Sequence, residues 1–190
     1  NEDLGDMLDY DAVNEFRHRS LNPEHPAQRG TAQNPDVFFQ AREASNKYYD
    51  ALPSVVEDYM NQVNEKLGTN YGLFNYVGAP DAEHVIVAMG SVCDTIGEAI
   101  DYLNANGEKV GLVKVRLYRP FVGDKLVECL PDTVKQISVL DRTKEPGAIG
   151  EPLYLDVVAA LNGTKFNNVT IFGGRYGLGS KDTTPAQIIA

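Results

Sequence analysis

Apolar residues follow two patterns along this chain, and the change comes near residue 71. Beyond it, short apolar runs alternate with segments in which apolar residues recur at helical spacing. His84–Met89 is a continuous apolar run, which is typical of a strand buried on both faces. We predict further strands at Phe74–Val77, Val110–Leu117, Gln136–Leu140 and Val169–Phe172. We predict helices from Asp94 or Thr95 to Ala105, at Lys125–Leu130 and at Glu151–Leu161. This alternation indicates a three-layer α/β/α domain with a mostly parallel sheet.

The first 70 residues are polar and predict an extended, partly helical arm with a linker helix. A helix is expected around Asp9–Ser20. Ser20–Asp36 contains three prolines and no periodic apolar pattern, so it should be extended. Asp36–Tyr49 gives no clear pattern. Pro53 should open a helix that ends at Leu67, because Gly68 supplies a stop.

The aromatic residues of the arm lack a core of their own. Phe38, Phe39, Tyr48 and Tyr49 lie in a stretch with no amphipathic period long enough to bury them. Segments of this kind stay ordered when another surface covers them. We therefore expect these four side chains to dock on the α/β domain at residues 71–190 or on a second copy of the chain.

The chain ends in a glycine loop followed by the start of a helix. Pro185 suits the first turn of that helix, with Asp182 or Thr183 as its cap. Because the helix breaks off in its first turns, we expect the chain to be a piece of a longer protein. The loop from Gly174 to Lys181 is not a P-loop, since Ser180 precedes Lys181 where the motif needs Lys and then Ser or Thr. It is interpreted as a tight turn.

Composition narrows the possible functions. The net charge of -10 argues against nucleic acid, whose phosphates would be repelled. No apolar run is long enough to predict a membrane span. Cys93 and Cys129 are the only cysteines, which favours reduced thiols in a cytoplasmic protein. Two thiolates are too few for an iron–sulfur cluster, which takes four.

Two loops are candidate binding sites: the first could hold an anion through its backbone N–H groups, and the second could meet a ligand or a partner domain. Gly90 and Ser91 follow one buried strand, and Arg142, Lys144 and Glu145 follow another. If these strands are neighbours, the loops line the crevice where ligands bind in open parallel sheets. One hypothesis is a stand-alone phosphate- or nucleotide-binding α/β module; the alternative is an ordinary strand-to-helix turn beside a solvated charged loop. No catalytic residue and no metal ligand set is indicated.

Long ordered strings of this sequence resemble pyruvate:ferredoxin (flavodoxin) oxidoreductase over nearly the whole chain. Such strings are far more specific than a short motif. They are His25–Asp36, Tyr48–Pro53, Gly78–Glu83, Ala88–Ser91, Leu117–Phe121, Val139–Gly147, Gly150–Asp156 and Gly174–Lys181. The resemblance places the chain at the end of the family's first domain and over its second, transketolase C-terminal-like domain.

For the fold, the resemblance implies a five-stranded mixed sheet of order 1-3-2-4-5 with an antiparallel first strand. For function, it implies a large cytoplasmic homodimer that oxidises pyruvate to acetyl-CoA and CO₂ and reduces ferredoxin or flavodoxin. That parent would use thiamine diphosphate, Mg²⁺, [4Fe–4S] clusters and CoA. No position here matches the family's binding residues, so we expect no cofactor in this piece and no activity from it alone. Its implied role is structural, as an organiser of the missing domains or a plain spacer between them.

Overall fold

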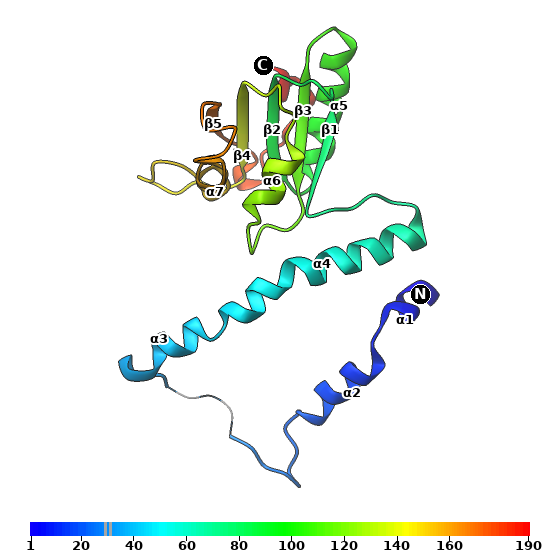
Figure 1. The fold of residues 1–190 in the computed structure, drawn as a ribbon, viewed down its shortest axis with the longest axis vertical. Coiled ribbons are helices and arrows are strands. Elements are labelled where there is room, and N and C mark those ends of the chain that lie inside the picture. Colours follow the sequence, from blue (N-terminus) through cyan, green and yellow to red (C-terminus); the bar gives the residue numbers. More distant parts are fainter. Residues whose placement is uncertain (29, 31) are drawn as a thin grey trace.

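A five-stranded sheet with the strand order β1-β3-β2-β4-β5 is the centre of the computed structural model, which describes residues 1–28, 30 and 32–190 (Figure 1). The strands are β1 (Phe74–Gly78), β2 (His84–Met89), β3 (Val110–Val115), β4 (Gln136–Asp141) and β5 (Thr170–Arg175). β1 runs antiparallel to β3, and all other neighbours are parallel. The predicted α/β sheet, its order and the pairing of β2 with β4 are confirmed.

Helices cover both faces of this sheet and form two apolar layers. On one face, α6 (Gly123–Cys129) and α7 (Pro152–Leu161) contribute Leu126, Leu153 and Val157 to the larger core. On the other face, α5 (Val92–Ala105) contributes Ile96 and Ile100 to a smaller core. The short helix α8 (Pro185–Ile189) packs on that second core.

Strand β2 is a continuous apolar run because it packs between the two cores. Val85 and Val87 belong to the core beneath α6 and α7, whereas Ala88 belongs to the core beneath α5. Successive side chains of a strand point to opposite faces, so a strand in the middle of a three-layer domain needs apolar residues at every position. Val85, Val87 and Ala88 are at most 1% exposed. Complete burial of a valine contributes about 1.5–3 kcal/mol.

The arm consists of four helices, none of which contains a fully buried residue. They are α1 (Glu2–Met7), α2 (Tyr10–His18), α3 (Pro35–Glu43) and α4 (Asn46–Leu67). In Figure 1, α1, α2 and α3 lie away from the sheet, and α4 is the long helix that leads from α3 to β1. An ion pair of 3.1 Å joins Lys66 near the end of α4 to Asp6 of α1. Because the four arm helices contain no buried residue, most of their surface is exposed to solvent.

Helix α4 begins earlier than predicted. Pro53 lies inside the helix, which starts at Asn46, so the prediction that Pro53 opens it is wrong. A proline usually breaks a helix because it has no N–H and crowds the preceding turn. A full helical turn of α4 already precedes Pro53. Helix α3 accounts for most of Asp36–Tyr49, the stretch that gave no clear pattern in the sequence. The stop at Gly68 is confirmed, with a left-handed φ of 66° that glycine adopts without strain.

Three other helix starts were misassigned, among them that of α6, which begins at Gly123 and not at the predicted Lys125. α5 begins at Val92 with Ser91 as its cap residue, two residues before the predicted Asp94. Thr184 caps α8, in place of Asp182 or Thr183. The Thr184 hydroxyl accepts the Gln187 N–H while the Gln187 side chain accepts the Thr184 N–H, so a capping box fixes this start.

The aromatic residues of the arm do not reach the α/β domain, so that half of the docking prediction is wrong. Phe38 is 53% exposed and Phe39 is 70% exposed, and Tyr48 and Tyr49 are also exposed. Helix α3 and the start of α4 lie away from the sheet (Figure 1). Docking on a second copy stays a prediction.

Among the described residues, no helix has the length and the apolar character needed to cross a bilayer.

Candidate functional site

The predicted crevice exists where β2, β4 and β5 end. It is a polar cavity of about 210 Å³, formed by the start of α5, the residue after β4 and the loop after β5. Its lining residues are Ser91, Val92, Thr95, Arg142, Tyr176, Gly177, Ser180, Lys181, Asp182 and Thr183. Two of the predicted candidates, Ser91 and Arg142, therefore lie in one hollow.

The other candidates lie outside that cavity. Gly90, Lys144 and Glu145 are not among its lining residues. The backbone N–H of Glu145 turns inward and donates to Glu151 Oε2 at 2.7 Å, and Lys144 is exposed to solvent. The loop after β4 thus brings only Arg142 to the crevice.

Arg142 is held in place by the glycine loop. Its Nε donates to the Gly177 carbonyl at 3.1 Å. Gly177 has a φ of 64°, and a Cβ there would meet Arg142 Nε at 3.1 Å, which is tighter than ordinary contacts. Glycine therefore permits both the turn and the close approach of the guanidinium. The interpretation of this loop as a turn is confirmed, but the loop also forms one wall of the cavity.

Tyr176 closes the cavity on the side of the core. The Tyr176 hydroxyl donates to the Met89 carbonyl at 3.4 Å, and the Tyr176 backbone N–H donates to the backbone carbonyl of Asp141 at 3.1 Å. Burial raises the pKa of the Tyr176 phenol above its ordinary value. The phenol is therefore protonated at neutral pH and can donate to the carbonyl.

Two buried carboxylates position the neighbouring loop, and sequence reasoning missed both roles. Asp141 is 3% exposed and accepts the N–H groups of Leu153 (3.0 Å) and Tyr154 (3.1 Å) at the start of α7. Glu151 is 5% exposed, accepts from Glu145 and pairs with Arg175 at 3.0 Å. A signal was present, because an acidic residue at the end of an apolar strand often caps a following helix. These carboxylates hold the fold at the sheet edge.

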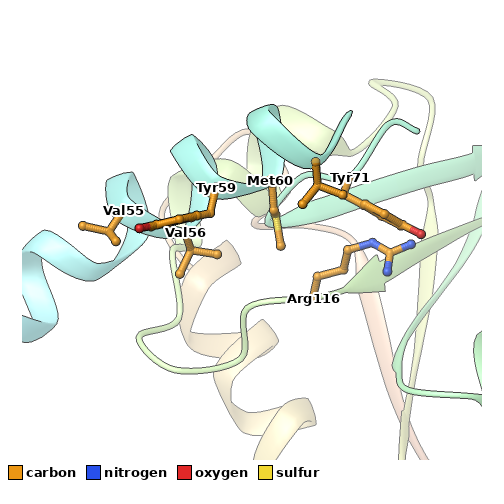
Figure 2. Close-up of a pocket in the computed structure, with 7 residues that line it drawn as sticks. Val55, Val56, Tyr59, Met60, Tyr71 and Arg116 are labelled. Carbon is orange, nitrogen blue, oxygen red and sulfur yellow. The ribbon is translucent and has the colours of Figure 1, made fainter. Parts of the chain in front are cut away.

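A second hollow lies between the arm and the sheet (Figure 2). It has a volume of about 420 Å³ and is lined by Val55, Val56, Tyr59, Met60, Val63, Tyr71 and Arg116. The guanidinium of Arg116 stacks on the Tyr71 ring at 4.5 Å from its centroid, and Arg116 Nε donates to Asn75 Oδ1 at 2.7 Å. Val56 and Met60 pack against the larger core, so this apolar hollow is the seam where α4 meets the α/β domain.

The described residues offer no ligand set for the iron–sulfur clusters or the Mg²⁺ that the resemblance implies for the parent. Cys93 packs in the core beneath α5 and Cys129 beside the core beneath α6, on opposite faces of the sheet. Burial raises the pKa of both thiols, that of Cys129 to about 11, which disfavours the thiolate that binds iron. Within residues 1–28, 30 and 32–190, no three His, Cys, Asp or Glu side chains are grouped so that they could hold a metal ion such as Mg²⁺.

Comparisons with known proteins agree along the whole length. A family model described as pyruvate:ferredoxin oxidoreductase core domain II matches residues 82–188. A second model, the thiamine diphosphate-binding domain of pyruvate flavodoxin/ferredoxin oxidoreductase, matches residues 1–61. Pyruvate:ferredoxin oxidoreductase from Moorella thermoacetica is 56% identical over 189 residues. Pyruvate-flavodoxin oxidoreductase from Enterobacter agglomerans is 57% identical over 189 residues.

These matches cover all of this chain but a small part of the relatives. The chain spans 16% of the length of the Moorella and Enterobacter proteins. It spans 10% of the pyruvate dehydrogenase [NADP(+)] from Cryptosporidium parvum, to which it is 48% identical. A solved 2-oxoglutarate:ferredoxin oxidoreductase from Magnetococcus marinus matches 68% of this chain and 20% of its own, with 18% identity and a TM-score of 0.43.

Proposed function

Because the chain belongs to the pyruvate:ferredoxin oxidoreductase family, we propose that it is the structural connector between the catalytic domains of such an enzyme. The parent would oxidise pyruvate in the presence of CoA to acetyl-CoA and CO₂, and pass the electrons to ferredoxin or flavodoxin. Its thiamine diphosphate, Mg²⁺ and clusters would be held by segments other than these 190 residues. The parent would be a cytoplasmic homodimer.

One observation carries this proposal: α4 joins two different environments. Val56 and Met60 of α4 pack against the core of the α/β domain. In α3 and the first turn of α4, by contrast, four aromatic side chains are more than half exposed: Phe38, Phe39, Tyr48 and Tyr49. Paired aromatic side chains are rarely left uncovered in a stable protein. The arm therefore has the form of a segment whose outer part belongs against another domain.

We place the division between the two parts at about residue 70. Residues 1–70 would form the arm and linker helix from the end of the preceding domain, and 71–190 the α/β domain. The two family matches, at 1–61 and 82–188, support this division because they lie on either side of it. The turn after α4, with its left-handed glycine at Gly68, supplies the physical break.

A double substitution tests whether another domain covers the arm. Phe38→Ser with Phe39→Ser should change the free energy of unfolding of the 190-residue chain by less than about 0.5 kcal/mol, because both rings already meet water. In the native gene product the same change should cost about 6–10 kcal/mol, because two buried rings would be lost at about 3–5 kcal/mol each. Denaturant unfolding of both proteins measures this difference. An equal, small effect in both would overturn the proposed connector.

The matched control is Tyr102→Ser, since Tyr102 of α5 is 59% exposed on the α/β domain itself. The mass of the native gene product is a separate check. A product several times longer than this chain is expected, whereas a mass near 20.8 kDa would exclude a parent enzyme.

A further inference from the structure

The polar cavity at the carboxyl edge of the sheet has the chemistry of an oxyanion site. Arg142 and Lys181 supply two positive charges from loops that are 39 positions apart in sequence. Ser91, Thr95, Ser180 and Thr183 add hydroxyl groups from both sides of the same hollow. From this convergence we propose that the cavity binds the phosphate group of a small phosphorylated molecule. The proposal goes beyond the connector role and does not rest on it.

Much of the donor capacity of this cavity is unused by the residues that the structure describes. Within residues 1–28, 30 and 32–190, the Arg142 guanidinium is engaged through Nε alone, with the Gly177 carbonyl. Among the described residues, Ser91 makes no cap hydrogen bond with its side chain at the start of α5. A guanidinium, an ammonium and hydroxyls converging from several sides suit a tetrahedral phosphate.

Contacts outside the cavity hold the loops that form its walls in place. Gly177 accepts the Arg142 Nε–H, and the Tyr176 hydroxyl joins the loop to the end of β2. The segment after Lys181 is anchored by α8, whose Ile188 packs on the core beneath α5. Arg142 and Lys181 therefore project from two loops that are each tied to a neighbouring element.

The size and the remaining charge of the cavity indicate the kind of ligand. About 210 Å³ is more than one phosphate group fills, so space remains for the group that carries it. Asp182 also lines the cavity and opposes a bare anion. The local charge is still positive, with Arg142 and Lys181 against Asp182, in a chain whose net charge is -10. The Asp182 carboxylate is suited to accept a hydrogen bond from a hydroxyl group that the ligand carries next to its phosphate.

Inorganic phosphate titrated into the ¹⁵N-labelled 190-residue chain at constant ionic strength tests the site. We expect saturable amide shifts confined to the start of α5 and the loop around Gly177–Lys181. Arg142→Gln and Lys181→Gln should each weaken binding about tenfold, since each removes a charge-assisted contact. Asp182→Asn should tighten binding a few-fold, because it removes a repulsive charge.

The control is Lys135→Gln, since Lys135 pairs with Glu83 at 2.6 Å next to the opposite end of β4 and should leave binding unchanged. Preserved amide dispersion in each variant shows that it is folded. Shifts that stay linear, or that sodium chloride reproduces, would overturn the proposal. So would a Lys135→Gln effect as large as that of Lys181→Gln, or weaker binding in Asp182→Asn.

Discussion

At the scale of single residues, Asp141 is the clearest case of a polar side chain that the fold requires. It lies at the end of β4, is almost fully buried, and accepts the N–H groups of Leu153 and Tyr154. Helix starts leave such N–H groups without partners, and a carboxylate also matches the positive end of the helix dipole. One side chain therefore joins the central sheet to α7.

Asp141→Ala should lower the free energy of unfolding by about 2–3 kcal/mol, because it leaves buried donors unsatisfied. Urea unfolding followed by circular dichroism measures this loss. Asp132→Ala is the matched control: Asp132 pairs with Lys165 on the surface, and exposed pairs contribute roughly 0–1 kcal/mol. Equal effects of the two substitutions would refute the role given to Asp141.

Cys129 provides a test that depends on pH. Burial raises the pKa of its thiol from the ordinary value of 9.0 to about 11, so the folded chain keeps the proton that the unfolded chain loses first. The stabilising contribution is complete below pH 9 and is lost as the pH rises through about 11. In a Cys93→Ala variant at pH 8, iodoacetamide should modify native Cys129 roughly 100-fold more slowly than urea-unfolded Cys129. Equal rates would contradict the burial.

At the scale of elements, the strands were predictable and several helix starts were not. The run His84–Met89 identified β2 because burial on both faces leaves one pattern for a central strand. Pro53 misled the prediction of α4, since proline is common in a first turn and tolerated only rarely within a helix. Starts are set by local hydrogen bonds such as the capping box at Thr184, which several neighbouring residues could form equally well.

The candidate site was only partly predictable for a related reason. Ser91 and Arg142 follow adjacent parallel strands, and that topology brings them together. Lys181 was not predicted, because its loop was identified as a turn and nothing local indicates that α8 folds back over α5. Lys144 and Glu145 were included only because they are near Arg142 in sequence. A side chain's direction in a loop depends on tertiary contacts, such as the bond from the Glu145 N–H to Glu151.

The proline inside α4 gives a prediction for that helix. Pro53→Ala restores an N–H and removes the crowding of the preceding turn, so α4 should become more stable by up to about 3 kcal/mol. Amide exchange across residues 46–60 should slow, and helical ellipticity should rise. Pro185→Ala is the control, because proline at the first turn of α8 costs little. Unchanged exchange in α4 would mean that tertiary contacts decide its stability.

At the scale of the whole molecule, the α/β part of the chain has a buried core and the arm helices have none. The buried apolar side chains of the described residues all lie from Leu73 onward, in the sheet and the helices that cover it, whereas the arm helices contain no buried residue. An element with so little buried surface is stabilised mainly by what packs against it. This asymmetry is the physical basis for the proposed connector between domains of a larger enzyme.

Catalysis should therefore require the remainder of the parent. The described residues bring together no metal ligand set, and the two thiols lie on opposite faces of the sheet. The most direct measurement is pyruvate-dependent reduction of a viologen, with CoA, thiamine diphosphate and Mg²⁺, by this chain and by the native gene product side by side. The account predicts turnover by the native product and none above background by the 190-residue chain. Turnover by the 190-residue chain would contradict it.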